Sequence, residues 1–154
     1  MKGLLKKSIA LVLVLVLSCL TLSGCKDDSE TLQDGYYSAE MSDYSHGWKE
    51  FVTICVSNGE LSTVEYNAKN ASGFIKSWDM NYMRNMEFLQ GTYPNLYTRT
   101  YAADLLEKGN ADQVDTVTGA SSSGITFKQL AAAAIQQAQK GDTSKAIVEA
   151  QSEE

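Results

Sequence analysis

The sequence predicts an α+β domain in which a small antiparallel sheet of three to five strands packs against two or three helices. Three observations lead to this prediction. Segments with alternating apolar residues come first, a strong hairpin turn joins two of them, and segments with helical periodicity follow. The chain has 154 residues. What remains after a predicted signal peptide is of a size that suits a single domain with one core.

The expected strands lie in the first half of the chain, at Gly35–Met41, Trp48–Val56 and Leu61–Ala68. Between the second and the third stands Asn58-Gly59. An Asn-Gly pair favours a type I′ turn, because both central residues of that turn need a positive φ. A two-residue turn here predicts the cross-strand pairs Val56–Leu61 and Cys55–Ser62.

The apolar period changes from two to between three and four after Gly73, which indicates helices. One helical face collects Ile75, Trp78, Tyr82, Met86 and Leu89, and Gly91 is expected to end that segment. A second helix is expected to begin near Pro94, whose fixed φ suits a first turn, and to end at Gly109. It carries Tyr97, Tyr101 and Leu105. These positions are expected to pack as core over the sheet.

The last helix has the clearest pattern in the chain. Its apolar stripe is expected at Phe127, Leu130, Ala131, Ala134, Ile135 and Ala138. Ser122 or Ser123 is expected to cap its N-terminus and Gly141 to end it. Before it, Val114 and Val117 suggest a short edge strand. After it, residues 142–154 are expected to form an acidic tail that is frayed or weakly helical.

The N-terminal segment has the organisation of a bacterial lipoprotein signal. Three lysines precede a short apolar run, and Leu22-Ser23-Gly24-Cys25 looks like a lipobox. We therefore expect residues 1–24 to be removed, Cys25 to carry a diacylglyceryl group, and residues 25–33 to tether the domain to membrane lipid. An uncleaved anchor and an unlipidated cysteine are the alternatives. Each places the domain at a bacterial cell membrane, facing outside the cytoplasm.

The charge of the mature chain limits its partners. Removal of residues 1–24 takes away three of 13 basic residues and none of the 19 acidic ones, so ten basic residues face 19 acidic ones and the formal charge changes from −6 to −9. This balance argues against nucleic acid and against electrostatic binding to anionic lipid. Cys55 is then the last thiol, expected as a small buried hydrophobe, and His46 is expected in a solvated loop. We expect no metal site.

The stretch Asp115-Thr116-Val117-Thr118-Gly119-Ala120-Ser121 precedes the last helix. A helix N-terminus offers free N–H groups and the positive end of a dipole, which favour a phosphate. Gly119 and Ala120 allow close backbone approach, Ser121 offers a hydroxyl, and Asp115 is placed to act on that hydroxyl. These residues suit a phosphoester at Ser121. The alternative is that the loop only begins a helix.

At these residues the sequence resembles the FMN-binding domain family, which includes flavin-carrying subunits of ion-pumping respiratory complexes and bacterial surface lipoproteins. The family motif Asp-x-x-Ser/Thr-Gly-Ala-Thr/Ser is met by Asp115, Thr118, Gly119, Ala120 and Ser121. Further matches are Asp34-Gly35-Tyr36-Tyr37, Asn58-Gly59, Tyr66-Asn67-Ala68 and Lys76-Ser77-Trp78-Asp79. The resemblance implies an FMN-binding domain at residues 34–141. The chain departs from the usual motif by having serine, rather than threonine, at its last position.

The resemblance implies that a flavin transferase joins the FMN phosphate to Ser121, with Asp115 needed by the transferase and Thr118 as a second hydroxyl at the phosphate. One or two of Trp78, Tyr82, Met83 and Met86 would then line the flavin ring. The implied function is electron transfer between an unknown redox donor and acceptor, rather than catalysis on a substrate of its own. The alternative is a surface binding or structural lipoprotein with reversible FMN or no flavin. A hydrolase is disfavoured, because no Gly-x-Ser-x-Gly or Walker motif is present.

Overall fold

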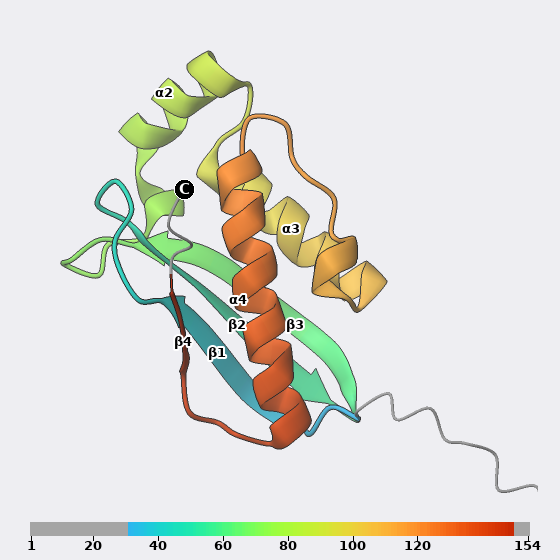
Figure 1. Cartoon of the computed structure of the whole chain (residues 1–154). Coiled ribbons are helices and arrows are strands. Elements are labelled where there is room, and N and C mark those ends of the chain that lie inside the picture. The colour runs from blue at the N-terminus through green and yellow to red at the C-terminus, as the bar shows by residue number, and fades with distance from the viewer. Residues whose placement is uncertain (1–30, 150–154) are drawn as a thin grey trace, which may run out of the picture. The chain divides into compact units, whose positions relative to one another are not determined.

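The computed structural model describes residues 31–149, which fold as an α+β unit (Figure 1). The strands are β1 (Gly35–Met41), β2 (Lys49–Ser57), β3 (Glu60–Lys69) and β4 (Ala146–Val148). The helices are α2 (Met80–Gln90), α3 (Pro94–Lys108) and α4 (Ser121–Lys140), with short 3-10 helices η1 (Lys76–Trp78) and η2 (Ala111–Gln113). The α+β prediction is confirmed. The predicted signal peptide and the lipidation site at Cys25 lie outside the described residues.

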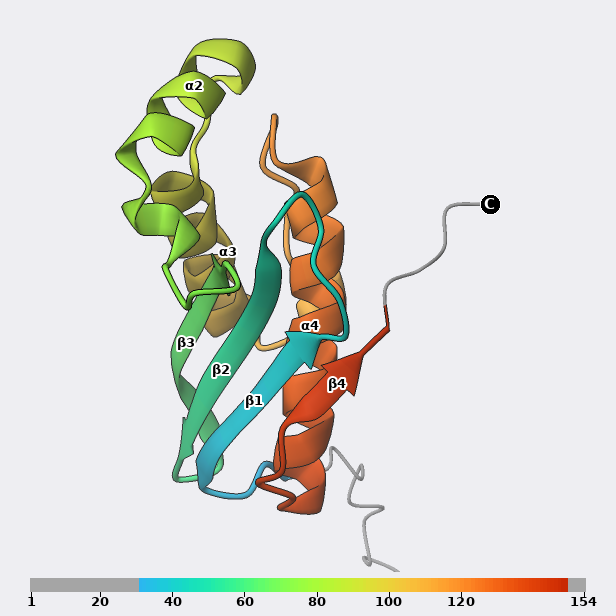
Figure 2. The ribbon, with the colours of Figure 1, turned by 90° about the vertical axis from the view of Figure 1, so that its left-hand side faces the viewer.

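The four strands form one sheet in the order β3-β2-β1-β4, and α3 and α4 cover one face (Figure 2). No helix of residues 31–149 covers the other face. The sheet is mixed rather than purely antiparallel, because β4 pairs parallel to β1. The prediction of a frayed or weakly helical tail is therefore wrong at Ala146–Val148. This apolar triplet pairs with the backbone groups of the β1 edge, and the acidic residues around it hid that signal.

The predicted hairpin is confirmed at Asn58-Gly59, where both residues have a positive φ, of 55° and 77°. Val56 pairs with Leu61 as expected. Cys55, however, pairs with Thr63 instead of Ser62, because a β-bulge shifts the register between Cys55 and Val56. Cys55 is also half-buried rather than buried, so its prediction as a core residue is wrong.

The core lies between the sheet and two helices. Tyr97, Tyr101 and Leu105 of α3 and the α4 stripe are buried as predicted, except for the half-buried Ile135. Helix α2 differs, because none of its residues is buried. The prediction that its apolar face packs as core is therefore wrong, except at the half-buried Met86, which packs against the core. Helix α2 contacts η1 and extends beyond the end of the sheet, so no other element of residues 31–149 covers most of its side chains (Figure 2).

The helix ends follow the predicted glycines, because Gly91, Gly109 and Gly141 adopt left-handed conformations just after α2, α3 and α4. The predicted caps of α4 are wrong. The helix begins at Ser121 and its N-cap is Ala120, so all three serines lie in the first turn. The predicted edge strand at Val114 and Val117 is also absent. The buried Val114 ends η2, and extended coil follows.

Candidate functional site

The predicted motif forms a turn that runs directly into the N-terminus of α4. Ser121 is exposed as the first helical residue, and no side chain caps the N-terminal N–H groups of this helix within the described part of the chain. A long helix with free N–H groups at its start is favourable for an anion. The turn therefore presents the hydroxyl of Ser121 beside unpaired backbone donors.

Tyr101 holds this turn from beneath. Its buried hydroxyl accepts a hydrogen bond from the Val117 N–H (3.1 Å) and donates one to the Ala120 carbonyl (2.9 Å). A Cβ added to Gly124 would lie 2.6 Å from the same hydroxyl. A glycine one turn into α4 thus allows the phenol to reach the turn, which is fixed to the core on both sides of Gly119.

Gly119 closes the turn against the end of α2. Its φ is +82°, and an added Cβ would lie 2.4 Å from the Gln90 carbonyl oxygen. Both the backbone conformation and the space therefore require glycine here. Thr118, by contrast, is exposed.

Lys108 links the start of the turn to α3 through two ion pairs. Its ammonium nitrogen lies 2.8 Å from Asp115 Oδ2 and 3.0 Å from Asp104 Oδ1. The Asp104 carboxylate also accepts the Asp115 N–H at 2.6 Å. The Asp115 side chain is 90% exposed and pairs with Lys108. Within residues 31–149 no hydrogen bond joins Asp115 to Ser121, so the structure does not bring these two predicted site residues into contact.

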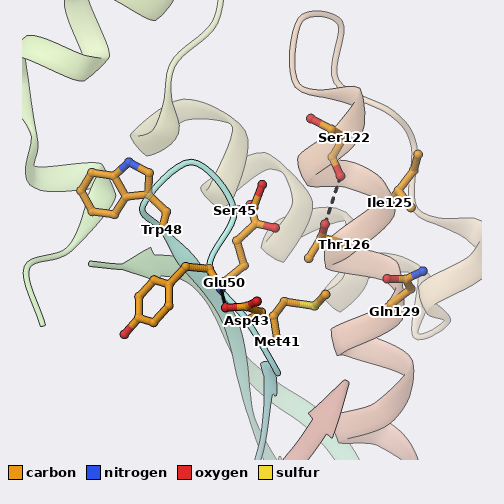
Figure 3. A pocket seen from close by; sticks show the side chains of 10 residues that line it. Met41, Asp43, Ser45, Trp48, Glu50, Ser122, Ile125, Thr126 and Gln129 are labelled. Atoms are coloured by element: carbon orange, nitrogen blue, oxygen red, sulfur yellow. Dashed lines mark hydrogen bonds between the residues drawn. The ribbon is translucent and has the colours of Figure 1, made fainter. Parts of the chain in front are cut away.

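Two adjoining cavities open beside the turn, and they share Ser45, Trp48, Glu50, Ser122 and Thr126. The outer cavity, of about 490 Å³, extends toward Met41, Asp43 and Gln129 (Figure 3). The inner cavity, of about 320 Å³, extends toward Lys76, Tyr82, Met86 and Tyr97 and is bounded by Gly119 and Ala120. Volumes of this size are typical of small-molecule sites.

Glu50 lies between the two cavities and is anchored to the sheet and to α4. Its Oε1 accepts hydrogen bonds from Tyr66 (3.0 Å) and Ser123 (3.1 Å). The Tyr66 hydroxyl also lies 2.8 Å from the Ser123 carbonyl oxygen. Burial, with the nearby Glu50 carboxylate, raises the pKa of Tyr66 well above its ordinary value. The phenol therefore stays protonated, and this cluster ties the first turn of α4 to β2 and β3.

Lys76 places a positive charge in the wall of the inner cavity. Its ammonium nitrogen lies 4.8 Å from the centre of the Tyr82 ring. Burial lowers the pKa of Lys76, but the phenols of Tyr97 and Tyr82 and the Glu50 carboxylate outweigh burial and raise that pKa above its ordinary value. Lys76 is therefore an ammonium at neutral pH, half-buried among aromatic rings.

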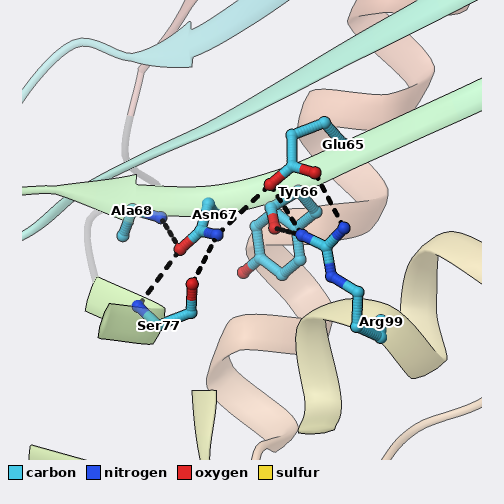
Figure 4. Close-up of polar contacts among 6 residues, drawn as sticks. All are labelled: Glu65, Tyr66, Asn67, Ala68, Ser77 and Arg99. Carbon is cyan, nitrogen blue, oxygen red and sulfur yellow. Dashed lines mark hydrogen bonds and ion pairs between the residues drawn. The ribbon is translucent and has the colours of Figure 1, made fainter. Parts of the chain in front are cut away.

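A polar network fixes the backbone next to Lys76 (Figure 4). Buried Asn67 donates to Ser77 Oγ (2.9 Å) and accepts from the Ser77 and Ala68 N–H groups. Asn67 also donates to Glu65, which pairs bidentately with Arg99 of α3. Strand β3, η1 and α3 are thus joined by hydrogen bonds whose central residue is buried.

The sequence is 35% identical over 127 residues to the 15 kDa lipoprotein of Treponema pallidum (strain Nichols), a match that covers 82% of this chain and 89% of the relative. The chain belongs to the family of this bacterial lipoprotein. The lipoprotein fold also resembles the crystal structure of a Clostridium perfringens protein, with a TM-score of 0.75 and 32% identity over 78% of this chain and 99% of that chain. No protein-family model matches the sequence.

The lipoprotein structure places only some of the residues predicted at the flavin ring in the inner cavity. Tyr82 and Met86 line this cavity, whereas Trp78 lines a separate pocket beside Arg99, and Met83 lines neither cavity. His46 is exposed as predicted and also reaches the inner cavity.

Sequence reasoning missed Trp48, Glu50 and Tyr97 as site residues, and it left Lys76 without a role. Trp48 directly precedes β2 and Glu50 is its second residue, about 70 residues before the motif, and no local pattern marks them. The segment Lys76-Ser77-Trp78-Asp79 resembles the FMN-binding domain family, and this resemblance is the available signal for Lys76.

The described part of the lipoprotein offers few other sites. Among residues 31–149 no helix is long and apolar enough to cross a bilayer. The same residues contain no group of three or more His, Cys, Asp or Glu side chains arranged to hold a metal.

Proposed function

We propose that this lipoprotein is an extracytoplasmic electron carrier that holds one FMN, with the FMN phosphate esterified to Ser121. The observation that carries the proposal is the rigid turn, whose backbone Gly119 and Tyr101 fix. Ser121 is exposed at the uncapped start of α4, and its neighbours Ala120 and Ser122 line an aromatic-walled cavity. The residue types fit the group. Free N–H groups suit a phosphate, and Trp48, Tyr82 and Tyr97 suit a flat ring.

In this proposal the chain accepts FMN from the transferase and holds it. A flavin transferase supplies FMN from FAD: the Ser121 oxygen forms a bond to the FMN phosphorus, the pyrophosphate bond breaks, AMP leaves, and the hydroxyl proton passes to a base of the transferase. Bound FMN supplies electron-transfer chemistry, and the protein supplies position and electrostatics. The α4 N-terminus stabilises the phosphate charge, and Lys108 holds Asp115 exposed, where the transferase can reach it.

The test is the intact mass of the domain that starts after Cys25, purified from cells with and without a flavin transferase. We expect an increase of one FMN less one water, only with the transferase, in the peptide that contains Ser121. Ser121→Ala should abolish the increase and Ser121→Thr should keep it. Ser122→Ala is the matched control, because Ser122 is an exposed serine in the same helical turn. Covalent flavin on the Ser121→Ala protein would contradict the proposal.

A second candidate is a lipoprotein of the same fold that binds FMN reversibly. It is favoured by the position of the Asp115 carboxylate, which pairs with Lys108 and has no hydrogen bond to Ser121 within the described residues. A yellow protein that loses its colour on denaturation and desalting would support this candidate. A colourless protein that binds no added FMN would exclude both.

A further inference from the structure

Lys76 is the starting point, because its ammonium group lies in the wall of the inner cavity and forms no ion pair within residues 31–149. Five lysines in residues 31–149 are half-buried. Four of them reach an oxygen atom: Lys49 and Lys128 bind carbonyls, and Lys69 and Lys108 bind carboxylates. Within that part of the chain Lys76 forms no ion pair, and its nitrogen faces the Tyr82 ring and the inner cavity. Burial disfavours the charged form, but the nearby Tyr97 and Tyr82 phenols and the Glu50 carboxylate already outweigh burial and raise the pKa of Lys76. A ligand with negative charge in the same cavity would stabilise this cation further.

The position of this cation is fixed by its neighbours. Ser77, the next residue, is buried and exchanges hydrogen bonds with the buried Asn67 (Figure 4). The Glu50 carboxylate, which lines the same cavity, is hydrogen-bonded to Tyr66 and Ser123. The backbone at Lys76 is therefore fixed, and the contact with the Tyr82 ring holds the ammonium in the cavity wall.

The proposed cofactor changes charge in a way that suits this cation. An oxidised flavin ring is neutral, and two electrons with one proton convert it to a reduced ring that carries one negative charge on its pyrimidine edge. A cation beside that edge stabilises the reduced form more than the oxidised form, because only the reduced form is charged. The electrons come from a membrane donor in the cell, or from dithionite in the experiment below.

We propose that Lys76 faces the pyrimidine edge of the flavin in the inner cavity and raises its reduction potential by stabilising the anionic reduced ring. This inference rests on the proposed function and adds the residue that tunes the reduction potential of the bound flavin. Lys76 acts as a binding and tuning residue, and Asn67 positions it through Ser77. If the protein binds reduced flavin more tightly than oxidised flavin, the reduction potential of the bound flavin rises by the corresponding amount.

The experiment compares wild type with Lys76→Met, Lys76→Arg and a matched control, Lys140→Met, which removes an exposed lysine from the far end of α4. Each protein is loaded by coexpression with the transferase and its flavin content is measured by mass. The reduction potential is then followed spectroscopically during dithionite titration from pH 6 to pH 9. Thermal melting of each variant checks the fold.

We expect Lys76→Met to lower the ratio of reduced to oxidised flavin about tenfold at a fixed potential. Reduction of the flavin should take up one proton per two electrons as long as the reduced ring stays anionic. In the wild type this should hold down to a lower pH than in Lys76→Met, because Lys76 stabilises the anion. Lys76→Arg should keep most of the wild-type potential, and Lys140→Met should match wild type.

A loaded Lys76→Met protein with the potential and proton uptake of Lys140→Met would overturn this inference and leave the proposed function intact. Loss of flavin loading in Lys76→Met with an unchanged potential for the loaded fraction would place Lys76 at the phosphate and also overturn it. A wild-type protein that carries no flavin and binds none from solution would overturn both proposals together.

Discussion

Helix α4 buries Phe127, Leu130 and Ala134 completely against the sheet, whereas α2 buries no residue and leaves Phe88 88% exposed. Both helices border the inner cavity, α4 with its first turn and α2 with Tyr82 and Met86. One wall of the site is therefore part of the core, and the other is joined to the body mainly through η1. The comparison teaches that the α4 wall is built rigidly, while the α2 wall rests on a few contacts, such as Tyr82 with Trp48 and Gln90 with Gly119.

The largest expected effect tests the rigid wall. Phe127 stacks on Tyr101 with a centroid distance of 5.4 Å and also contacts Tyr66. Phe127→Ala should lower the free energy of unfolding by about 3–5 kcal/mol, because it leaves a cavity at the centre of the core. Urea unfolding followed by circular dichroism measures this. A loss below about 1 kcal/mol would show that α4 is not the rigid element that we describe.

The next effect lies at the contact between the two walls. Gly119→Ala should cost about 2–3 kcal/mol, from the left-handed backbone conformation and from the approach of the new Cβ to the Gln90 carbonyl. Gly91→Ala is the matched control: its φ is also positive, at +70°, but a Cβ there meets nothing within 4 Å. Chemical unfolding of both variants isolates the steric part. Equal losses would contradict the close packing of the turn on α2.

A smaller effect concerns the polar network beside Lys76. Burial raises the pKa of Glu65, but hydrogen bonds from Arg99 and Asn67 and the Arg99 charge outweigh burial and hold that pKa below its ordinary value of 4.5. A lowered folded-state pKa adds stability above pH 4.5 that is lost as the pH falls through the folded pKa. Arg99→Met should therefore flatten the decline in stability below pH 4.5.

At neutral pH the same variant should lose about 1 kcal/mol or less, because the Glu65 side chain is 41% exposed and solvent screens the pair. Thermal melting between pH 3 and pH 7 measures both effects. Lys140→Met, which removes an exposed charge, serves as the control. An acid decline as steep in Arg99→Met as in wild type would show that the Glu65–Arg99 pair does not contribute to stability.

The smallest expected effect tests the exposed wall. Phe88→Ala makes the same chemical change as Phe127→Ala, but the side chain is almost fully in water. The free energy of unfolding should change by less than about 0.5 kcal/mol. The unfolding assay used for Phe127→Ala gives the direct comparison. A loss above about 2 kcal/mol would mean that α2 packs against the body more tightly than the structure indicates.

The sequence by itself determined the local features of this protein. Asn58-Gly59 makes its hairpin, and Gly91, Gly109 and Gly141 end the three helices, because each depends on the backbone preferences of one or two residues. The buried stripe of α4 also followed from its period. The motif was correctly placed at a helix N-terminus for the same reason, although its caps were not.

Only the tertiary structure decided which of these features meet. It places Lys76 and Glu50 beside a turn about 40 and 70 residues further along the chain and adds β4 in parallel to β1. Within the described residues it also leaves every residue of α2 at least partly exposed. A helical period shows which face of a helix is apolar, but not whether another element covers that face. That outcome depends on packing between segments distant in sequence, which the order of neighbouring residues does not record.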